Sequence, residues 1–307
     1  MYDLIILGGG PAGVSAGVYA ARKKLKTAII SPDFSGQSAV SETIYNWPGT
    51  PEIGGQELAD NFKKHILYYK GPLFDIIEGE KAVEVSKNGK EITIKTDMGK
   101  SYSTLSLLVV TGSSRKKLQV ENADKYEHRG ITYCASCDGP MFADKDVLVV
   151  GGGNAGFESA SQLLAYCKSV TLIHRNKDFK ADKMTIEKLL QNPKMKTITN
   201  ADILKVDGDD FLKSLTYKDK DTGEEHTIET SGIFVEIGQI PNTSFVENIV
   251  KLDEFGKIIV NPTDQSSSEE GIWAAGDCAN GKYHQNSISA GDAVKALEDI
   301  YLWIQKK

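Results

Sequence analysis

The 307-residue sequence lacks the features that mark membrane-spanning and nucleic-acid-binding proteins. No apolar run approaches the roughly 18 residues that a membrane-spanning helix needs. The formal net charge is −6, so there is no excess of basic residues for nucleic acid or a membrane surface. Apolar residues make up 40% and charged residues 25% of the chain, which is the balance of a globular protein. Its length fits two domains.

Cysteine is also scarce, with four residues, and only Cys134 and Cys137 lie close together. One close pair does not make the disulfide framework of a small secreted protein. A metal site would need four ligands, and no second C-x-x-C motif or paired histidine is near, so we expect no metal. The isolated Cys167 and Cys278 are expected to be buried and structural. This cysteine usage favours the reducing cytoplasm. Residues 2–7 lack a basic region and are expected to form a strand rather than a signal peptide.

Glycine is concentrated in two loops of one pattern, at residues 8–13 (GGGPAG) and 151–156 (GGGNAG). Each loop follows a short apolar run, which predicts a buried strand, and precedes a segment predicted to be helical. In such a β-α-β unit the first glycine allows a tight turn, the second lets the backbone approach a pyrophosphate, and the third lets the helix pack against the strand. The loops therefore predict two dinucleotide sites; the alternative is a strand-helix turn without a ligand.

The two halves of the sequence repeat one plan. After each β-α-β unit comes a stretch of alternating polarity that predicts an antiparallel meander, at residues 82–110 and 203–229. The chain then returns to the first domain at residues 272–277 and ends in a predicted helix to about residue 304. We therefore predict an α/β fold with two Rossmann-like, three-layer dinucleotide-binding domains, the second inserted in the first. Linkers are expected near residues 116–120 and 238–243.

A dithiol motif, Cys134-Ala135-Ser136-Cys137-Asp138-Gly139, directly precedes the second unit. Two cysteines spaced by two can close a small disulfide ring and attack another disulfide as thiolates. Asp138 is a candidate acid/base that protonates a departing thiolate or accepts a thiol proton; the alternative for Asp138 is a turn or helix-cap residue. With two glycine loops, the motif predicts an enzyme that moves electrons from a nucleotide to a disulfide.

Together these motifs resemble the low-molecular-weight thioredoxin reductase family and the related flavoprotein component of alkyl hydroperoxide reductase, over essentially the whole chain. The resemblance extends to residues 46–49 (NWPG), residues 238–243 (GQIPNT) and the Gly276-Asp277 pair. It implies that residues 1–115 and 245–307 bind FAD and that residues 117–243 bind a nicotinamide nucleotide. It also implies a homodimer.

The resemblance assigns site residues by position. Those expected at FAD are Gly8, Gly10, Pro11, Ala12, Gly13, Gln37, Asn46, Thr111, Gly112, Gly276, Asp277, His284 and Gln285, where His284 replaces the usual arginine. Those expected at the nicotinamide nucleotide are Gly151, Gly153, Asn154, Ala155, Gly156, Glu158, His174, Arg175 and Lys180.

The choice between NADPH and NADH depends on the segment about twenty residues after the second loop. An acidic residue there would hold the 2′-hydroxyl of NADH, whereas Arg175 and Lys180 suit a 2′-phosphate, and this favours NADPH. The NADPH-specific family has His-Arg-Arg-x-x-x-Arg, from which Asn176 and Lys180 depart. Residues 137–140 (CDGP) and 153–154 (GN) instead favour the NADH-using branch. The alternative is that Arg175 and Lys180 lie on a solvated edge of the domain and bind no phosphate.

The resemblance implies that Cys137 faces the flavin and that Cys134 attacks the disulfide of thioredoxin or a thioredoxin-like protein. It also implies rotation of the second domain about its linkers. Arg129, Met141 and Phe142 flank the dithiol and are candidate docking residues for the partner. The alternative enzyme is an NADH-dependent reductase of a peroxiredoxin-like or glutaredoxin-like carrier. A reductase with a non-nicotinamide donor is disfavoured by the intact second loop. A flavin-binding regulatory module would have no need of the dithiol.

Overall fold

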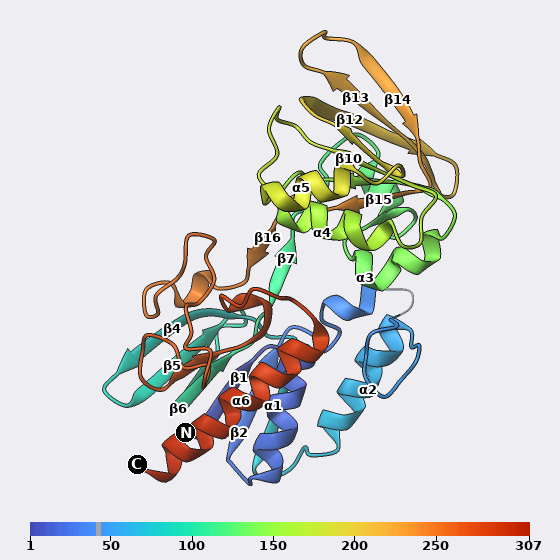
Figure 1. Cartoon of the computed structure of the whole chain (residues 1–307). Helices are drawn as coiled ribbons and strands as arrows, with labels where there is room; N and C mark the ends of the chain where they lie inside the picture. The colour runs from blue at the N-terminus through green and yellow to red at the C-terminus, as the bar shows by residue number, and fades with distance from the viewer. Residues whose placement is uncertain (41–43) are drawn as a thin grey trace. The chain divides into compact units, whose positions relative to one another are not determined.

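The computed structural model describes residues 1–40 and 44–307, which form two compact units (Figure 1). The first unit takes its residues from both ends of the chain, up to Ser114 and from Ile240 onwards. The second consists chiefly of the intervening Arg115–Gln239. The second unit is thus inserted in the first.

The first unit is built on one sheet in the order β3-β2-β1-β6-β5-β4, with β17 also paired to β6. The strands β3, β2, β1, β6 and β17 run parallel, whereas β4, β5 and β6 form an antiparallel meander. Its elements are β1 (Tyr2–Leu7), α1 (Pro11–Arg22), β2 (Thr27–Ser31), α2 (Gly55–Leu67), β3 (Phe74–Glu78), β4 (Ala82–Asn88), β5 (Glu91–Thr96), β6 (Ser101–Val109), β17 (Ile272–Ala274) and α6 (Asn286–Gln305).

The parallel part of this sheet is buried on both faces. Along β1, Leu4 and Ile6 pack with residues of α1 and α6, such as Ala16 and Leu297. The alternate residues Ile5 and Leu7 pack on the other face with the meander, which includes Val85, Ile92 and Ile94. Because successive side chains of a strand point to opposite faces, a continuous apolar run is what such a three-layer arrangement requires.

The second unit repeats this arrangement around the all-parallel sheet β11-β10-β9-β15-β8. Val147 and Val149 of β9 pack with α4, whereas Leu148 and Val150 pack with the meander β12-β13-β14. Its elements are β8 (Ile131–Thr132), α3 (Ala135–Asp138), β9 (Asp146–Val150), α4 (Asn154–Leu163), β10 (Ser169–Ile173), α5 (Lys183–Leu190), β11 (Met195–Ile198), β12 (Ala201–Gly208), β13 (Leu212–Asp219), β14 (Glu225–Glu229) and β15 (Gly232–Val235). The predicted α/β, three-layer fold class is confirmed.

The chain passes between the units twice, through the strands β7 (Ser113–Arg115) and β16 (Gln239–Pro241), which pair with each other. Just beyond β7, the Lys116 N–H donates to the Gly238 carbonyl oxygen at 3.0 Å. The two linkers are therefore hydrogen-bonded to each other and do not act as independent flexible chains.

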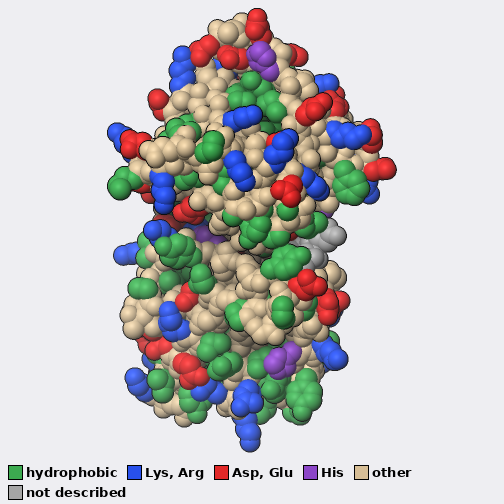
Figure 2. Space-filling model, turned by 45° about the vertical axis from the view of Figure 1, so that its right-hand side comes forward, with side chains coloured by type: hydrophobic (Ala, Val, Ile, Leu, Met, Phe, Trp, Pro, Cys, Tyr) green, Lys and Arg blue, Asp and Glu red, His purple; other side chains and the backbone are tan. Residues whose placement is uncertain are grey.

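The described residues contain no helix that is both long and apolar enough to cross a membrane. On the face drawn in Figure 2, acidic and basic side chains are interspersed, without a large region of one sign.

One buried polar contact ties β17 to α6, the helix whose N-terminus follows Gln285. The indole Nε1 of the buried Trp273 donates to Asp299 Oδ2 at 2.9 Å. We expect Asp299→Ala to destabilise the protein by about 1–3 kcal/mol, because the buried N–H loses its acceptor. Urea unfolding measures this loss. In a Trp273→Phe background, which has no indole N–H, Asp299→Ala should cost much less; equal losses in both backgrounds would contradict this assignment.

Candidate nucleotide and dithiol sites

The first glycine loop joins β1 to α1. A side chain would clash with the protein backbone at two of its glycines but would meet open space at a third. A Cβ on Gly8 would lie 2.3 Å from the Val110 carbonyl oxygen, and one on Gly13 would lie 1.8 Å from the Gly8 carbonyl oxygen. These glycines are required by packing. A Cβ on Gly10 would have no heavy atom closer than 4.0 Å, and the φ of Gly10 is an ordinary −76°. Neither packing nor backbone conformation requires glycine at this position.

The second loop, between β9 and α4, shows the same division. A Cβ on Gly151 would lie 2.2 Å from the Glu236 carbonyl oxygen, and one on Gly156 would lie 1.9 Å from the Gly151 carbonyl oxygen. A Cβ on Gly153 would meet nothing within 4 Å, at a φ of −94°. Each loop therefore keeps one stretch of bare backbone beside open space at a helix N-terminus. This is the geometry that a pyrophosphate needs.

Several residues predicted at the first nucleotide lie around the first loop. A Cβ on Gly8 would contact the Thr111 nitrogen at 3.2 Å, and one on Gly276 would contact Ala12 Cβ at 3.6 Å. Thr111 and Gly276 therefore flank the loop and the start of α1, where Pro11 is the first helical residue. Gly112, which follows Thr111, has a positive φ of 65°.

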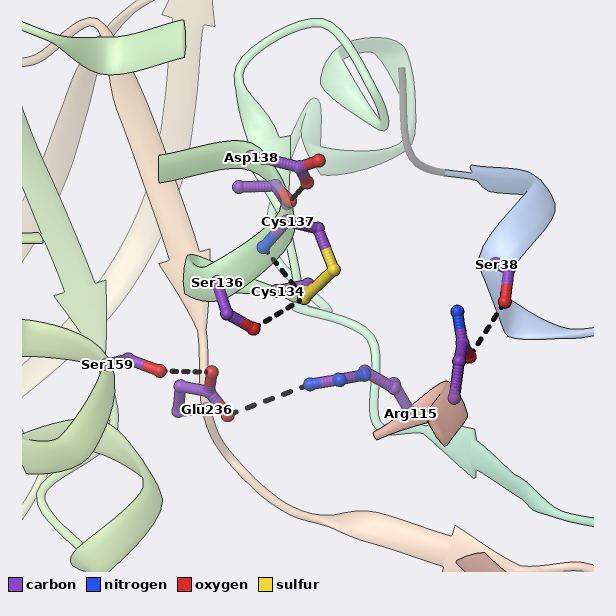
Figure 3. Close-up of a disulfide and its surroundings, with 10 residues drawn as sticks. Ser38, Arg115, Cys134, Ser136, Cys137, Asp138, Ser159 and Glu236 are labelled. Atoms are coloured by element: carbon purple, nitrogen blue, oxygen red, sulfur yellow. Dashed lines mark hydrogen bonds and ion pairs between the residues drawn. A yellow bond between two sulfur atoms is a disulfide. The ribbon is translucent and has the colours of Figure 1, made fainter. Parts of the chain in front are cut away.

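A second segment reaches the same loop. A Cβ on Gly36 would lie 3.2 Å from Gly10 Cα, so the turn before the exposed Gln37 packs against the loop. Ser38 Oγ donates to Asn286 Oδ1 at 2.9 Å, which brings this segment to the start of α6, next to Gln285 (Figure 3). Asn46, in contrast, is exposed and belongs to the second unit.

Asp277 and His284 form a polar chain that extends to Lys257. His284 Nδ1 lies 3.2 Å from Asp277 Oδ1, and His284 Nε2 lies 2.8 Å from Lys257 Nζ. Because an ammonium group can only donate, Nε2 accepts and the ring proton lies on Nδ1, from which it is donated to Asp277. No sequence pattern pointed to Lys257, since it lies 27 residues from His284 in the chain.

The side chain of His174 is hydrogen-bonded to the second glycine loop. It is 8% exposed, and its Nδ1 accepts the Gly152 N–H at 3.2 Å. Burial lowers the pKa of His174, and the nearby cations Arg175 and Lys180 act in the same direction. The imidazole is therefore neutral near pH 7, as its role as an acceptor requires.

The two predicted cations beside this loop, Arg175 and Lys180, are exposed. Neither forms an ion pair with another described residue. The Lys180 N–H donates to the Gly152 carbonyl oxygen at 2.8 Å, so Lys180 stays next to the loop. Two cations without an ion-pair partner among the described residues, in the segment that follows β10, suit an anionic ligand group.

The other residues predicted near the second loop lie in the first two turns of α4. Ala155 and Glu158 are exposed. The side chain of Asn154 accepts the Asp182 N–H through Oδ1 at 2.9 Å, which holds the segment that caps α5.

Cys134 and Cys137 form a disulfide at the start of α3, with their Cα atoms 5.3 Å apart (Figure 3). Cys134 Sγ accepts the Cys137 N–H at 3.2 Å and lies 3.4 Å from Ser136 Oγ. Both contacts would stabilise negative charge on Cys134 once the bond is reduced. Asp138 Oδ2 accepts the hydroxyl of Thr132, at the end of β8.

The two isolated cysteines are buried, and burial raises the pKa of each thiol to about 11. Cys167 and Cys278 therefore stay protonated, as expected of structural residues. No group of three or more His, Cys, Asp or Glu side chains suited to a metal ion is found within residues 1–40 and 44–307.

The docking role predicted for Phe142 is wrong. Its ring is 9% exposed and packs edge-on against Phe234, with ring centroids 5.2 Å apart. A Cβ on Gly232 would also clash with it, at 2.3 Å. Phe142 belongs to the core, whereas Met141 beside it is 37% exposed.

A largely buried carboxyl group at the end of β15 was missed. Glu236 Oε1 accepts the hydroxyl of Ser159 at 2.6 Å, and Oε2 lies 3.8 Å from Arg115 Nη1 (Figure 3). Burial raises the pKa of Glu236. The one sequence signal for it was an acidic residue that directly follows the apolar run 232–235.

Two glycine loops with open backbone, together with a disulfide, define a nucleotide-linked disulfide oxidoreductase. The family model described as pyridine nucleotide-disulphide oxidoreductase matches residues 2–293, and the chain belongs to this family.

Similar proteins fall into two named groups. The chain is 36% identical over 303 residues to the F component of the alkyl hydroperoxide reductase of Staphylococcus epidermidis, which covers 99% of this chain and 59% of that protein. It therefore spans less than two thirds of this curated relative. The solved thioredoxin reductase of Streptococcus pyogenes is 30% identical with a TM-score of 0.90, covering 100% of this chain and 99% of that one. For the thioredoxin reductase of T. acidophilum the identity is 34%, the TM-score 0.68 and the coverage 98% of both chains.

Gly153 and Gly156 provide a matched test of the second loop. We expect Gly153→Ala to fold normally and to weaken NADPH and NADH binding about tenfold or more, which corresponds to about 1.4 kcal/mol, because the methyl group enters the open space. Gly156→Ala should instead lower the thermal midpoint, because its Cβ meets backbone. Ligand titration and thermal unfolding of both variants measure this. Normal binding by folded Gly153→Ala would show that the open space holds no ligand.

Stability should also depend on the protonation of His174. Because the pKa of His174 is lower in the folded state than the unperturbed value of about 6.5, stability is complete above that pH and is lost as the pH falls towards the folded pKa. Thermal midpoints from about pH 8 to about pH 5 measure this loss. In His174→Asn, whose Oδ1 can still accept the Gly152 N–H, the loss should be smaller; identical pH profiles would refute the assignment.

Proposed function

We propose that the protein is an FAD-dependent reductase that passes electrons from NADPH through the Cys134–Cys137 pair to thioredoxin or a thioredoxin-like protein. We further propose that it works as a homodimer in the cytoplasm. The observation that carries the proposal is the disulfide itself, which lies at the start of α3 in the same unit as a glycine loop with open backbone. A nucleotide-binding protein without redox turnover has no use for this combination.

The residues of the first unit fit a bound FAD. The open backbone at Gly10 and the start of α1 would hold its pyrophosphate. Thr111 and Gly276 flank the loop, and Asp277 follows Gly276. These residues would contact the rest of the cofactor, with Gln37 and Gln285 on the neighbouring segments. When bound, FAD supplies the transfer of an electron pair from a nicotinamide to a disulfide.

The residues of the second unit fit a nicotinamide nucleotide. Gly153 at the start of α4 would hold its pyrophosphate, and His174 keeps the loop in place. Arg175 and Lys180 are uncommitted cations that favour a 2′-phosphate, and therefore NADPH. NADH remains the alternative, because Lys is a weaker substitute for a bidentate arginine.

The dithiol carries the reducing equivalents to the protein substrate. Reduction of the Cys134–Cys137 bond takes two electrons and two protons and yields two thiols. The thiolate of Cys134, stabilised by the Cys137 N–H and Ser136, attacks the substrate disulfide to form a mixed disulfide and release one substrate thiolate. Cys137 then attacks Cys134 Sγ, which restores the bond and releases the second substrate thiolate. Asp138 holds a proton for these steps.

The linkers are central to this proposal. Since the dithiol and the second glycine loop belong to one unit, each must in turn serve the same flavin. We propose that the unit rotates about the paired strands β7 and β16 to alternate between the two tasks.

A second candidate is an NADH-dependent reductase of a peroxiredoxin-like carrier. It is favoured by the similarity to the F component of alkyl hydroperoxide reductase, at 36% identity. The chain covers 59% of that relative, so any carrier function of the remaining part would have to come from another polypeptide or segment.

An anaerobic titration tests both candidates. We expect NADPH to bleach the flavin absorbance and oxidised thioredoxin to restore it, whereas preferential bleaching by NADH would favour the second candidate. Cys134→Ser should lose thioredoxin reduction entirely while its flavin is still bleached. Cys167→Ala, which changes a buried thiol outside the pair, is the matched control. Wild-type turnover by Cys134→Ser would exclude the dithiol mechanism.

A further inference from the structure

Glu236 lies where the strand order of the second sheet reverses. From β9 the chain continues to β10 on one side, and it returns later to β15 on the other side. In open α/β sheets the ligand crevice lies at the carboxyl ends of the strands at such a point. Glu236 directly follows β15, its N–H donates to the Val150 carbonyl oxygen at 2.8 Å, and its own carbonyl oxygen packs against Gly151. It therefore lies beside the glycine loop, at the end of the sheet where such a crevice is expected.

One oxygen of the Glu236 carboxyl group is hydrogen-bonded to another described residue and the other is not. Its side chain is 11% exposed, and Oε1 is fixed by the hydroxyl of Ser159 on α4. Oε2 receives no hydrogen bond from any described residue, and its ion-pair partner, Arg115 Nη1, is 3.8 Å away. A carboxyl oxygen that is accessible and has spare hydrogen-bonding capacity can accept an N–H from a ligand. Burial and the neighbouring Glu158 both raise the pKa of this carboxyl.

The direction of the bound dinucleotide follows from the charges around the loop. Arg175 and Lys180, which suit the 2′-phosphate of the adenosine end, lie after β10 on one side of β9. The pyrophosphate would lie at Gly153, next to β9. The other end of the dinucleotide therefore runs towards β15, where Glu236 is the first residue beyond the strand.

We propose that Glu236 recognises the carboxamide of the nicotinamide ring, with Oε2 accepting its N–H and with Ser159 and Arg115 holding the carboxyl group in place. This rests on the nicotinamide-nucleotide site of the proposed function and names a residue that determines its ligand specificity. A primary carboxamide offers a donor and an acceptor in one plane, and a carboxyl group offers the same pair when protonated. The raised pKa of Glu236 extends the pH range of that form.

The test compares two ligands that differ only in the nicotinamide. Calorimetry gives the Kd of NADP⁺ and of 2′-phospho-ADP-ribose, which lacks the ring, for the wild type, Glu236→Gln and Glu236→Leu. We expect Glu236→Leu to weaken NADP⁺ binding about 5- to 100-fold, the equivalent of one lost hydrogen bond to a buried group, and to leave 2′-phospho-ADP-ribose binding unchanged. Glu236→Gln, whose amide can still pair with a carboxamide, should stay within about threefold of the wild type for both ligands.

Three results would overturn the inference or its basis. Equal weakening of both ligands by Glu236→Leu would mean that Glu236 only supports the glycine loop. Unchanged binding of both would mean that it does not contact the nucleotide. If the wild type binds neither ligand, nor their counterparts NAD⁺ and ADP-ribose, the nucleotide site of the proposed function fails as well. Glu229→Leu, at an exposed position of β14, controls for the loss of one surface charge.

Discussion

The structure depends on one steric constraint that occurs twice: a helix must start directly against the end of a parallel strand. A Cβ added to Gly13 in the first loop, or to Gly156 in the second, would lie within 2 Å of a backbone oxygen. This close packing points the free N–H groups of α1 and α4 at the carboxyl edge of each sheet. The open positions at Gly10 and Gly153 then have a use only if a ligand occupies the space. The same loop thus combines glycines that packing requires with a glycine that faces open space.

Much of the fold could be predicted because it is encoded locally. The apolar runs of β1 and β9, the glycine loops and the alternating meanders each occupy a short stretch with a clear period. The strand β3 was missed because it is short and its burial pattern is mixed, with only Phe74 fully buried. Its place is set by pairing with β2, a contact that no local pattern encodes.

Site residues that belong to a short sequence motif could be predicted. Site residues that are defined by a tertiary contact were missed. Gly153, Cys134 and Asp138 belong to short motifs, so the sequence alone singles them out. Lys257 and Glu236 acquire their partners only in the folded chain, from residues 27 and 77 positions away. Phe142 was misplaced for the same reason, since its burial against Phe234 depends on contact between segments far apart in sequence.

The chain from Lys257 through His284 to Asp277 makes two distant positions interdependent. An arginine introduced at position 284 would place its guanidinium against the ammonium of Lys257, and at such distances like charges repel. Removing Lys257 first would instead leave Nε2 of His284 without its donor. Each single replacement, at position 284 or at position 257, is therefore unfavourable, and we expect the two residues to be replaced together. The positive charge near Asp277 is therefore shared between two segments of the chain, and a redesign of either position has to consider the other.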